Sequence, residues 1–214
     1  MAAEISSAVN ALCNFLSLTC VVTCLMLKLP QMLAILKSKS TQSLSLTSVL
    51  VEECAYSVIL SYNFAKGYPL PAYFEYTFLV IQDLILITLM LHYNRMLRIQ
   101  SLFYFIIYFI FFSCLAFGVF PEIILNTAMS GVTGLTIFSK GTQIRTLYQK
   151  KEPGQISQTS WTIAAYGALV RMLTSSLQTR DVVVFINNTV SASMNITMVS
   201  MLIYYKRQPK TKLN

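Results

Sequence analysis

Seven long apolar runs divide this chain and limit what it can fold into. Each run has about 20 residues, the length of helix that crosses the roughly 30 Å hydrocarbon core of a bilayer. The runs are Ser7–Leu27, Leu44–Ala65, Ala72–Leu91, Leu102–Phe120, Glu122–Phe138, Gln158–Leu177 and Val182–Tyr205. Only 11% of the residues are charged, against roughly 25% in soluble domains. The sequence therefore predicts an all-α polytopic membrane protein with seven transmembrane helices.

The prolines and the first residues support this division. All six prolines lie at or near the ends of the runs, where a missing backbone N–H costs least. Residues 1–10 contain Glu4 and no Lys or Arg, so they lack the positive region that precedes a cleaved signal peptide. We therefore expect the first run to be retained as a helix.

Lysine and arginine are distributed unevenly between the two sides of the expected membrane. The first, third and fifth loops and the C-terminal tail hold thirteen of them, whereas the opposite side holds Lys66 and Arg180. Positive residues collect in cytosolic loops, so we expect a lumenal N-terminus and a cytosolic C-terminus. The same distribution accounts for the net charge of +8. We therefore expect no nucleic-acid partner, which would need a basic surface with base-reading side chains.

The two ends of the chain resemble each other at an offset of 112 residues. The matched pairs are Lys28 and Lys140, Gln31 and Gln143, Leu36 and Tyr148, Ser45 and Ser157, Glu75 and Asn187, and Asp83 and Asn195. The first three expected helices therefore match the last three, and both sets start on the same side, as in transporters built from parallel repeats. We predict a first repeat at 7–101, a linker helix at 102–120, a second repeat at 121–205 and a basic tail at 206–214.

A motif at the end of the first expected helix resembles that of the PQ-loop repeat family, also called solute carrier family 66. Pro30 and Gln31, followed by the serine-rich segment 37–45, carry the first copy. The second copy, from Thr142 to Ser157, is degenerate because it lacks the proline. The resemblance implies a SWEET-like 3+1+3 arrangement of two parallel three-helix bundles and a linker helix. It also implies a small-solute carrier with a site between the repeats.

The same motif residues are candidates for hinges. Proline frees a backbone carbonyl and bends a helix, and a glutamine amide can pair with freed groups inside a membrane. We therefore predict that Pro30, Gln31, Thr142 and Gln143 form the PQ-loop hinges. A plain helix end at each position is the alternative.

Three carboxyl groups lie at a similar depth in the expected membrane. Glu52, Glu53 and Asp83 are each about eight residues from a cytosolic helix end, or roughly 12 Å deep. Ionisable residues at such depth are costly and mark candidate functional sites. Neighbouring helix residues point about 100° apart, so we do not expect Glu52 and Glu53 to face one cavity. A simple ion pair with Lys28 is the alternative role. We predict that the substrate or ion pathway is formed by Glu52, Asp83, Asn187 and Asn195.

Two further charges lie near the opposite side of the expected membrane. Glu75 and Arg171 are a few residues from lumenal helix ends, at roughly equal depths. We predict that these side chains form an ion pair that acts as a lumenal gate. A static bridge, or an Arg171 that reaches the membrane surface by itself, is the alternative.

The tail carries Lys210 and Lys212, five and three positions from its end. This spacing resembles the dilysine signal by which coat proteins return membrane proteins to the endoplasmic reticulum. We therefore expect an intracellular membrane location in the endoplasmic reticulum.

No catalytic, cofactor-binding or metal-binding pattern is evident in the sequence, and His92 has no nucleophile partner near it. We therefore expect no enzyme, and we predict a small-solute carrier or facilitator in the bilayer. A relative in the same family, the mannose-phosphate-dolichol utilisation defect protein, suggests an alternative: a non-enzymatic factor for the use of dolichol-linked sugars in glycosylation. A receptor for retrieval peptides is a further alternative.

Overall fold

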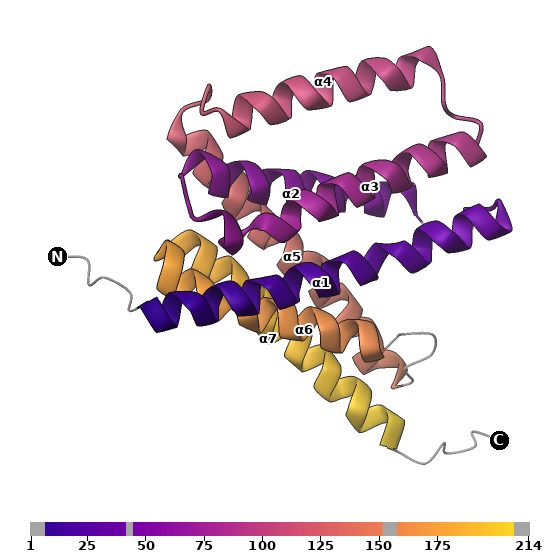
Figure 1. The fold of residues 1–214 in the computed structure, drawn as a ribbon. Helices are drawn as coiled ribbons and strands as arrows, with labels where there is room; N and C mark the ends of the chain where they lie inside the picture. Colours follow the sequence, from indigo (N-terminus) through magenta and orange to yellow (C-terminus); the bar gives the residue numbers. More distant parts are fainter. Residues whose placement is uncertain (1–6, 42–44, 152–157, 208–214) are drawn as a thin grey trace. The chain divides into compact units, whose positions relative to one another are not determined.

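The computed structural model describes residues 7–41, 45–151 and 158–207 and is helical in these ranges, which confirms the all-α class for them. The α-helices of the described residues are α1 (Ser7–Ser38), α2 (Leu46–Ala65), α3 (Phe74–Tyr93), α4 (Ile99–Ala116), α5 (Glu122–Lys150), α6 (Gln158–Thr174) and α7 (Val182–Arg207) (Figure 1). A short 3-10 helix, Leu70–Ala72, precedes α3. A π-helical turn, Ser175–Thr179, continues α6.

Each apolar run overlaps one α-helix, but two helices extend well beyond their runs. α1 continues to Ser38 and α5 continues to Lys150. The extensions are rich in Leu, Met, Gln, Lys and Arg, which favour helix in any solvent. The end of an apolar run marks where lipid-compatible composition ends, and the hydrogen-bonded helix does not have to end there.

Among the described residues, four helices have the length and composition of a membrane span. They are α1 over Ser7–Leu25, and α3, α4 and α7 over their full lengths. α2 contains Glu52 and Glu53, α5 is rich in Thr, Ser and Gln, and α6 is short, with 17 residues. The chain is a multi-pass membrane protein, and the count of seven spans stays a prediction.

The chain divides into two compact units, Met1–Met129 and Ser130–Asn214. The first contains α1 to α4 and the start of α5, and the second contains the rest of α5 with α6 and α7. The boundary falls within α5, whereas the sequence placed the start of the second repeat at residue 121. The repeat boundaries stay a prediction.

In the first unit, α3 is the central helix. It packs against both α1 and α2, and α2 also contacts α4 (Figure 1). An apolar cluster joins α1, α2 and α3 near the C-terminal end of α3. Its buried members are Met32, Ile35, Val49, Leu86, Ile87 and Met90. Close packing of these side chains holds the three helices together.

In the second unit, α7 has the corresponding central place. It packs against α6, and hydrogen bonds from Thr133 to Asn187 and from Lys140 to Ser191 join α5 to it. The apolar cluster of this unit contains Leu147, Met198 and Leu202, with Ile144, Trp161, Met201 and Tyr205 packed around them.

The two apolar clusters occupy matching positions in the chain. Each residue of the second cluster lies 112 positions after a member of the first. The pairs are Met32 and Ile144, Ile35 and Leu147, Val49 and Trp161, Leu86 and Met198, Leu89 and Met201, Met90 and Leu202, and Tyr93 and Tyr205. Side-chain packing therefore follows the same spacing as the sequence motifs.

Many threonine hydroxyls donate back to their own helix. On α5, Thr127, Thr142 and Thr146 each donate to the carbonyl four residues earlier, at 2.7–2.8 Å. Thr162 on α6 and Thr189 on α7 do the same, at 3.0 and 2.7 Å. These hydroxyls need no partner from another helix.

Candidate functional site

An ion cluster joins the first three helices. Lys28 of α1 lies between Glu52 of α2 and Asp83 of α3. Its ammonium nitrogen is 3.0 Å from Asp83 Oδ1 and also donates a hydrogen bond to Glu52. Asp83 is fully buried and Lys28 is 7% exposed, whereas 48% of the Glu52 side chain is exposed. The ion cluster therefore combines one positive and two negative formal charges, and only Glu52 is open to another molecule.

The positions of these residues along the helices explain why they meet. Lys28 precedes Met32 by four residues on α1, and Asp83 precedes Ile87 by four on α3. Because residues four apart lie on the same helix face, the charges lie one turn from the apolar cluster. The apolar side chains cover the ion cluster on that side, which keeps water out and strengthens the attraction between the charges.

The structure brings together two of the predicted pathway residues. Glu52 and Asp83 share Lys28, the partner that the sequence offered only as an alternative. The sequence contained two indications that Lys28 is important. It follows directly on an apolar run, and it aligns with Lys140 at the offset of 112.

Glu53 points away from the ion cluster, toward α4. Tyr108 of α4 donates a hydrogen bond to Glu53 Oε1, and Ser57 donates to the same oxygen at 3.2 Å. The hydroxyls of Ser57 and Tyr108 are 2.8 Å apart. Glu53 is 2% exposed, and its Oε2 has no hydrogen-bond partner among the described residues. The adjacent glutamates thus contact different helices, Glu52 the Lys28 side chain of α1 and Glu53 the Tyr108 side chain of α4. This agrees with the turn of about 100° between neighbouring helix residues.

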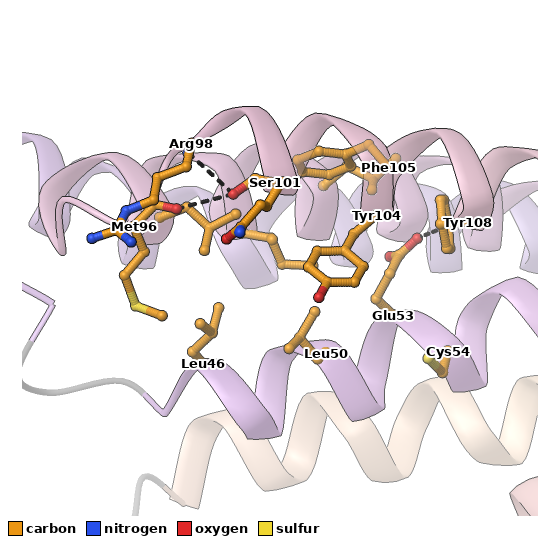
Figure 2. A pocket seen from close by; sticks show the side chains of 14 residues that line it. Leu46, Leu50, Glu53, Cys54, Met96, Arg98, Ser101, Tyr104, Phe105 and Tyr108 are labelled. Carbon is orange, nitrogen blue, oxygen red and sulfur yellow. Dashed lines mark hydrogen bonds between the residues drawn. The ribbon is translucent and has the colours of Figure 1, made fainter.

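Glu53 and Tyr108 line one end of a cavity of about 460 Å³ between α2, α3 and α4 (Figure 2). Arg98 and Ser101 lie at the other end, near the start of α4 (Figure 2). Between the two ends the walls are mostly apolar, formed by Leu46, Leu50, Leu84, Ile87, Leu91 and Phe105. The cavity is therefore amphipathic along its length, with a guanidinium at one end and a carboxyl at the other.

The sequence did not reveal this cavity. The aromatic composition of 102–120 matched a lipid-facing helix, and α4 is largely exposed. The missed signal is Tyr108, whose hydroxyl requires a polar partner when its ring is buried. That partner is the carboxyl of Glu53 on α2.

In the second unit, a row of polar residues follows one face of α7. Asn187, Ser191 and Asn195 are spaced four residues apart, so they lie along the same face. Thr133 donates to Asn187 Oδ1 at 3.0 Å, and Lys140 donates to Ser191 at 2.8 Å. Asn195 Nδ2 donates to the carbonyl of Ala164 on α6 at 3.0 Å. We call Thr133, Lys140, Asn187, Ser191 and Asn195 the α5–α7 polar row.

The remaining predicted residues stay separate. Helix α1 runs through Pro30 and Gln31, and α5 runs through Thr142 and Gln143, so all four lie within helices. Each helix is unbroken at these positions. Their role as hinges stays a prediction.

Glu75 and Arg171 are both buried, at 3% and 5% exposed. Glu75 belongs to the first unit and Arg171 to the second. Asn188 of α7 donates to the carbonyl of Arg171 at 3.4 Å, just before the π-helical turn. The gate pair stays a prediction, and Lys210 and Lys212 lie outside the described residues.

Metal-binding groups are not a feature of this site. Across 7–41, 45–151 and 158–207, no group of three or more His, Cys, Asp or Glu side chains is arranged to hold an ion. The polar groups on which we base a functional proposal are therefore the ion cluster, the Glu53–Tyr108 contact and the α5–α7 polar row.

Two comparisons with known proteins relate to this arrangement. The PQ loop repeat model matches residues 12–72, which contain Lys28, Glu52 and Glu53. A human protein, Solute carrier family 66 member 3, is 29% identical over 201 residues, covering 94% of this chain and 96% of the human one. The similarity thus extends across both units.

Proposed function

We propose that the chain is a member of the PQ-loop repeat family and a carrier or facilitator for a small solute in an intracellular membrane. The match of the family model to residues 12–72 and the 29% identity with the human protein support this proposal. The observation that carries the proposal is the ion cluster of Lys28, Glu52 and Asp83. Charged side chains inside a membrane protein cost several kcal/mol each unless they are paired, and they commonly mark transport pathways. The name of the human relative, a solute carrier, supports transport over catalysis.

The ion cluster has a property that a transport pathway needs. Lys28 divides its charge between two carboxylates, so a cation, a proton or a solute hydroxyl that approaches Glu52 competes with Lys28 for it. Lys28 then retains Asp83, and no charge is left alone in the interior. The exposed half of Glu52 gives access, and buried Asp83 provides the fixed anchor.

A two-repeat carrier also agrees with the packing. The matching apolar clusters at an offset of 112 support two parallel repeats, and their central helices, α3 and α7, correspond. Parallel repeats are one architecture of secondary transporters. The proposed carrier has seven spans, a lumenal N-terminus and a SWEET-like 3+1+3 arrangement. Asn187 and Asn195 would line its solute pathway.

The finer roles of the motif and gate residues belong to the same proposal. Hinges at the two motifs would let each three-helix bundle change shape during transport. A pair between Glu75 and Arg171 would close the lumenal side. The two tail lysines, Lys210 and Lys212, would return the protein to the endoplasmic reticulum through coat proteins.

The test is uptake by the purified full-length protein reconstituted in vesicles. Radiolabelled sugars, amino acids and organic acids are compared in wild type, Glu52→Gln and Glu122→Gln. Glu122 forms an exposed ion pair with Lys66 and serves as the matched control. We expect at least one solute to accumulate in wild type and Glu122→Gln, and its uptake to fall in Glu52→Gln. Equal uptake in all three variants and in empty vesicles would exclude transport of these solutes.

A specific observation favours a second function, the use of lipid-linked sugars. The cavity between α2, α3 and α4 is apolar along its walls and has Arg98 at one end. A dolichol-type lipid has a long apolar chain and a phosphate, which match these two properties. The test is the profile of lipid-linked oligosaccharides in cells that lack the protein. Truncated oligosaccharides, restored by wild type and not by Arg98→Ala, would support this function over solute transport.

A further inference from the structure

Lys140 occupies the position on α5 that matches Lys28 on α1, yet its surroundings carry no matching acids. Adding 112 to Glu52 and Asp83 gives Ala164 and Asn195. The two carboxylates of the first unit are thus replaced by a methyl group and an amide. The partner that the structure gives Lys140 is the hydroxyl of Ser191, at 2.8 Å.

The second unit has almost no acid that could neutralise this lysine. Between residues 130 and 214 the acids are Glu152 and Asp181. Asp181 caps α7, accepting hydrogen bonds from the backbone of Val183 and Val184 at 2.7 and 3.2 Å. It precedes Ser191 by ten residues, or about 15 Å along the helix. Glu152 lies outside the described residues, and no ion pair joins Lys140 to any described carboxylate.

In the α5–α7 polar row, one side-chain oxygen of Asn195 is also available to accept a hydrogen bond. Asn195 is 1% exposed, and its Oδ1 has no hydrogen-bond partner among the described residues. The ammonium of Lys140 has three N–H donors, of which Ser191 takes one. A buried acceptor without a donor is unfavourable, so the row has room for one more donor at Asn195 Oδ1.

We propose that the solute carried by this protein bears an anionic group, a carboxylate or a phosphate, which binds the Lys140 ammonium beside Ser191. A hydroxyl or amine of the same solute donates to Asn195 Oδ1. This inference rests on the proposed carrier function and names the substrate class. An anion supplies the charge that Glu52 and Asp83 supply to Lys28, and it recovers electrostatic energy in surroundings of low dielectric constant.

The first unit supports this assignment by contrast. Its ion cluster has a formal excess of one negative charge and repels an anion, so the anionic end of the solute belongs in the second unit. The donor group of the solute then belongs at Asn195 Oδ1 of the same unit. A hydroxy acid or a sugar phosphate has both kinds of group in one small molecule.

The test measures binding by the shift in thermal unfolding temperature of the full-length protein in detergent. The probes are lactate, glycerate, inorganic phosphate and glucose 6-phosphate, with glycerol and glucose as the neutral counterparts. Anionic lipid is left out of the sample and added separately in one arm, to separate a lipid headgroup from a free solute. We expect at least one anion, and neither neutral counterpart, to raise the unfolding temperature of wild type.

Two variants and a control locate the site. Lys140→Met removes the charge, and Asn195→Asp supplies the internal carboxylate that the first unit has at the matching position. We expect both to weaken anion binding roughly tenfold or more, the effect of losing about 1.4 kcal/mol. Lys206→Met removes a lysine of α7 that bonds to Gln158 at 3.2 Å, and it should bind as wild type does. Asn195→Asp keeps the side-chain shape but replaces the amide that donates to the Ala164 carbonyl with an acceptor. The unfolding temperature of each variant without ligand is therefore compared with wild type first, and Ser191→Ala, which removes the hydroxyl beside Lys140, is the further test if either variant does not fold.

The outcomes separate this inference from the carrier function. Anion binding that is unchanged in both variants, neutral solutes that bind as well as anions, or no anion that binds wild type would each overturn the inference. Uptake of a neutral solute would then leave the carrier function intact. Anion binding that requires Lys140, without any uptake, would keep the site and remove transport.

Discussion

In the first unit, Lys28 contacts two carboxylates, whereas Lys140 at the matching position of the second unit donates to the hydroxyl of Ser191, and the positions that match the two carboxylates are Ala164 and Asn195. Around these lysines the apolar positions correspond pair by pair. The packing framework is thus shared between the units, and the polar groups differ. The polar residues differ between the two units, yet the corresponding helix, α3 or α7, is central in each. We conclude that the order of the helices depends on the apolar positions.

The largest expected effect comes from removing the lysine of the first unit. Lys28→Met leaves fully buried Asp83 without its counter-ion, and breaking a buried ion pair from one side costs about 3–5 kcal/mol. Lys140→Met removes a lysine without a carboxylate partner and should leave the free energy of unfolding unchanged or raise it. Thermal unfolding of both variants in detergent measures the contrast. Equal losses would mean that the two lysines have equivalent surroundings.

The next effect tests whether the apolar clusters are equivalent. Leu86→Ala and Met198→Ala each empty a fully buried position, at matching places on α3 and α7. Truncations of this kind cost about 2–5 kcal/mol, and we expect the two losses to agree within about 1 kcal/mol because the surrounding residues match. A large loss in one unit alone, by the same measurement, would contradict shared packing.

A smaller effect concerns α4, which has no counterpart in the second unit. Tyr108→Phe removes one hydrogen bond to Glu53, and residue 165, the match of Glu53, is alanine. The loss should be about 1.5–3 kcal/mol, as for a hydrogen bond to a charged group. Tyr104→Phe, in the same cavity, is the control and should be nearly neutral. If both variants lose the same stability, the Glu53 contact has no special role.

The smallest expected effect on stability comes from breaking an exposed ion pair, which shows whether burial or pairing sets the cost. Lys66 and Glu122 form an ion pair like that of the ion cluster, but 68% of the Glu122 side chain is exposed. Exposed pairs contribute about 0–1 kcal/mol, so Glu122→Gln should barely change the unfolding temperature. A loss comparable to that of Lys28→Met would show that pairing itself, rather than burial, sets the cost.

The number and approximate positions of the helices could be predicted from the sequence because each apolar run is long. Counting residues along those helices predicted a similar level for Glu52 and Asp83, and the structure joins both side chains to Lys28. The ends of α1 and α5 could not be predicted in this way, since good helix formers continue beyond the apolar residues.

Side-chain direction was the main quantity that the sequence lacked. Glu52 and Glu53 are adjacent, and only the rotation of α2 decides that one faces Lys28 and the other Tyr108. That rotation results from the packing of α3 and α4 against α2. The cavity between these helices could not be predicted for the same reason, because its walls come from segments far apart in the chain.

The threonines that donate to their own helices have a consequence for insertion into lipid. Hydropathy by composition counts each hydroxyl as a group that must leave water, at roughly 2–7 kcal/mol when it finds no partner. Thr127 on α5, Thr162 on α6 and Thr189 on α7 lie within the apolar runs, and their hydroxyls keep these hydrogen bonds in any solvent. The partition cost of such a helix is therefore lower than its residue content indicates. A translocation machinery that senses whole helices would accept α5 more readily than a residue-by-residue scale does.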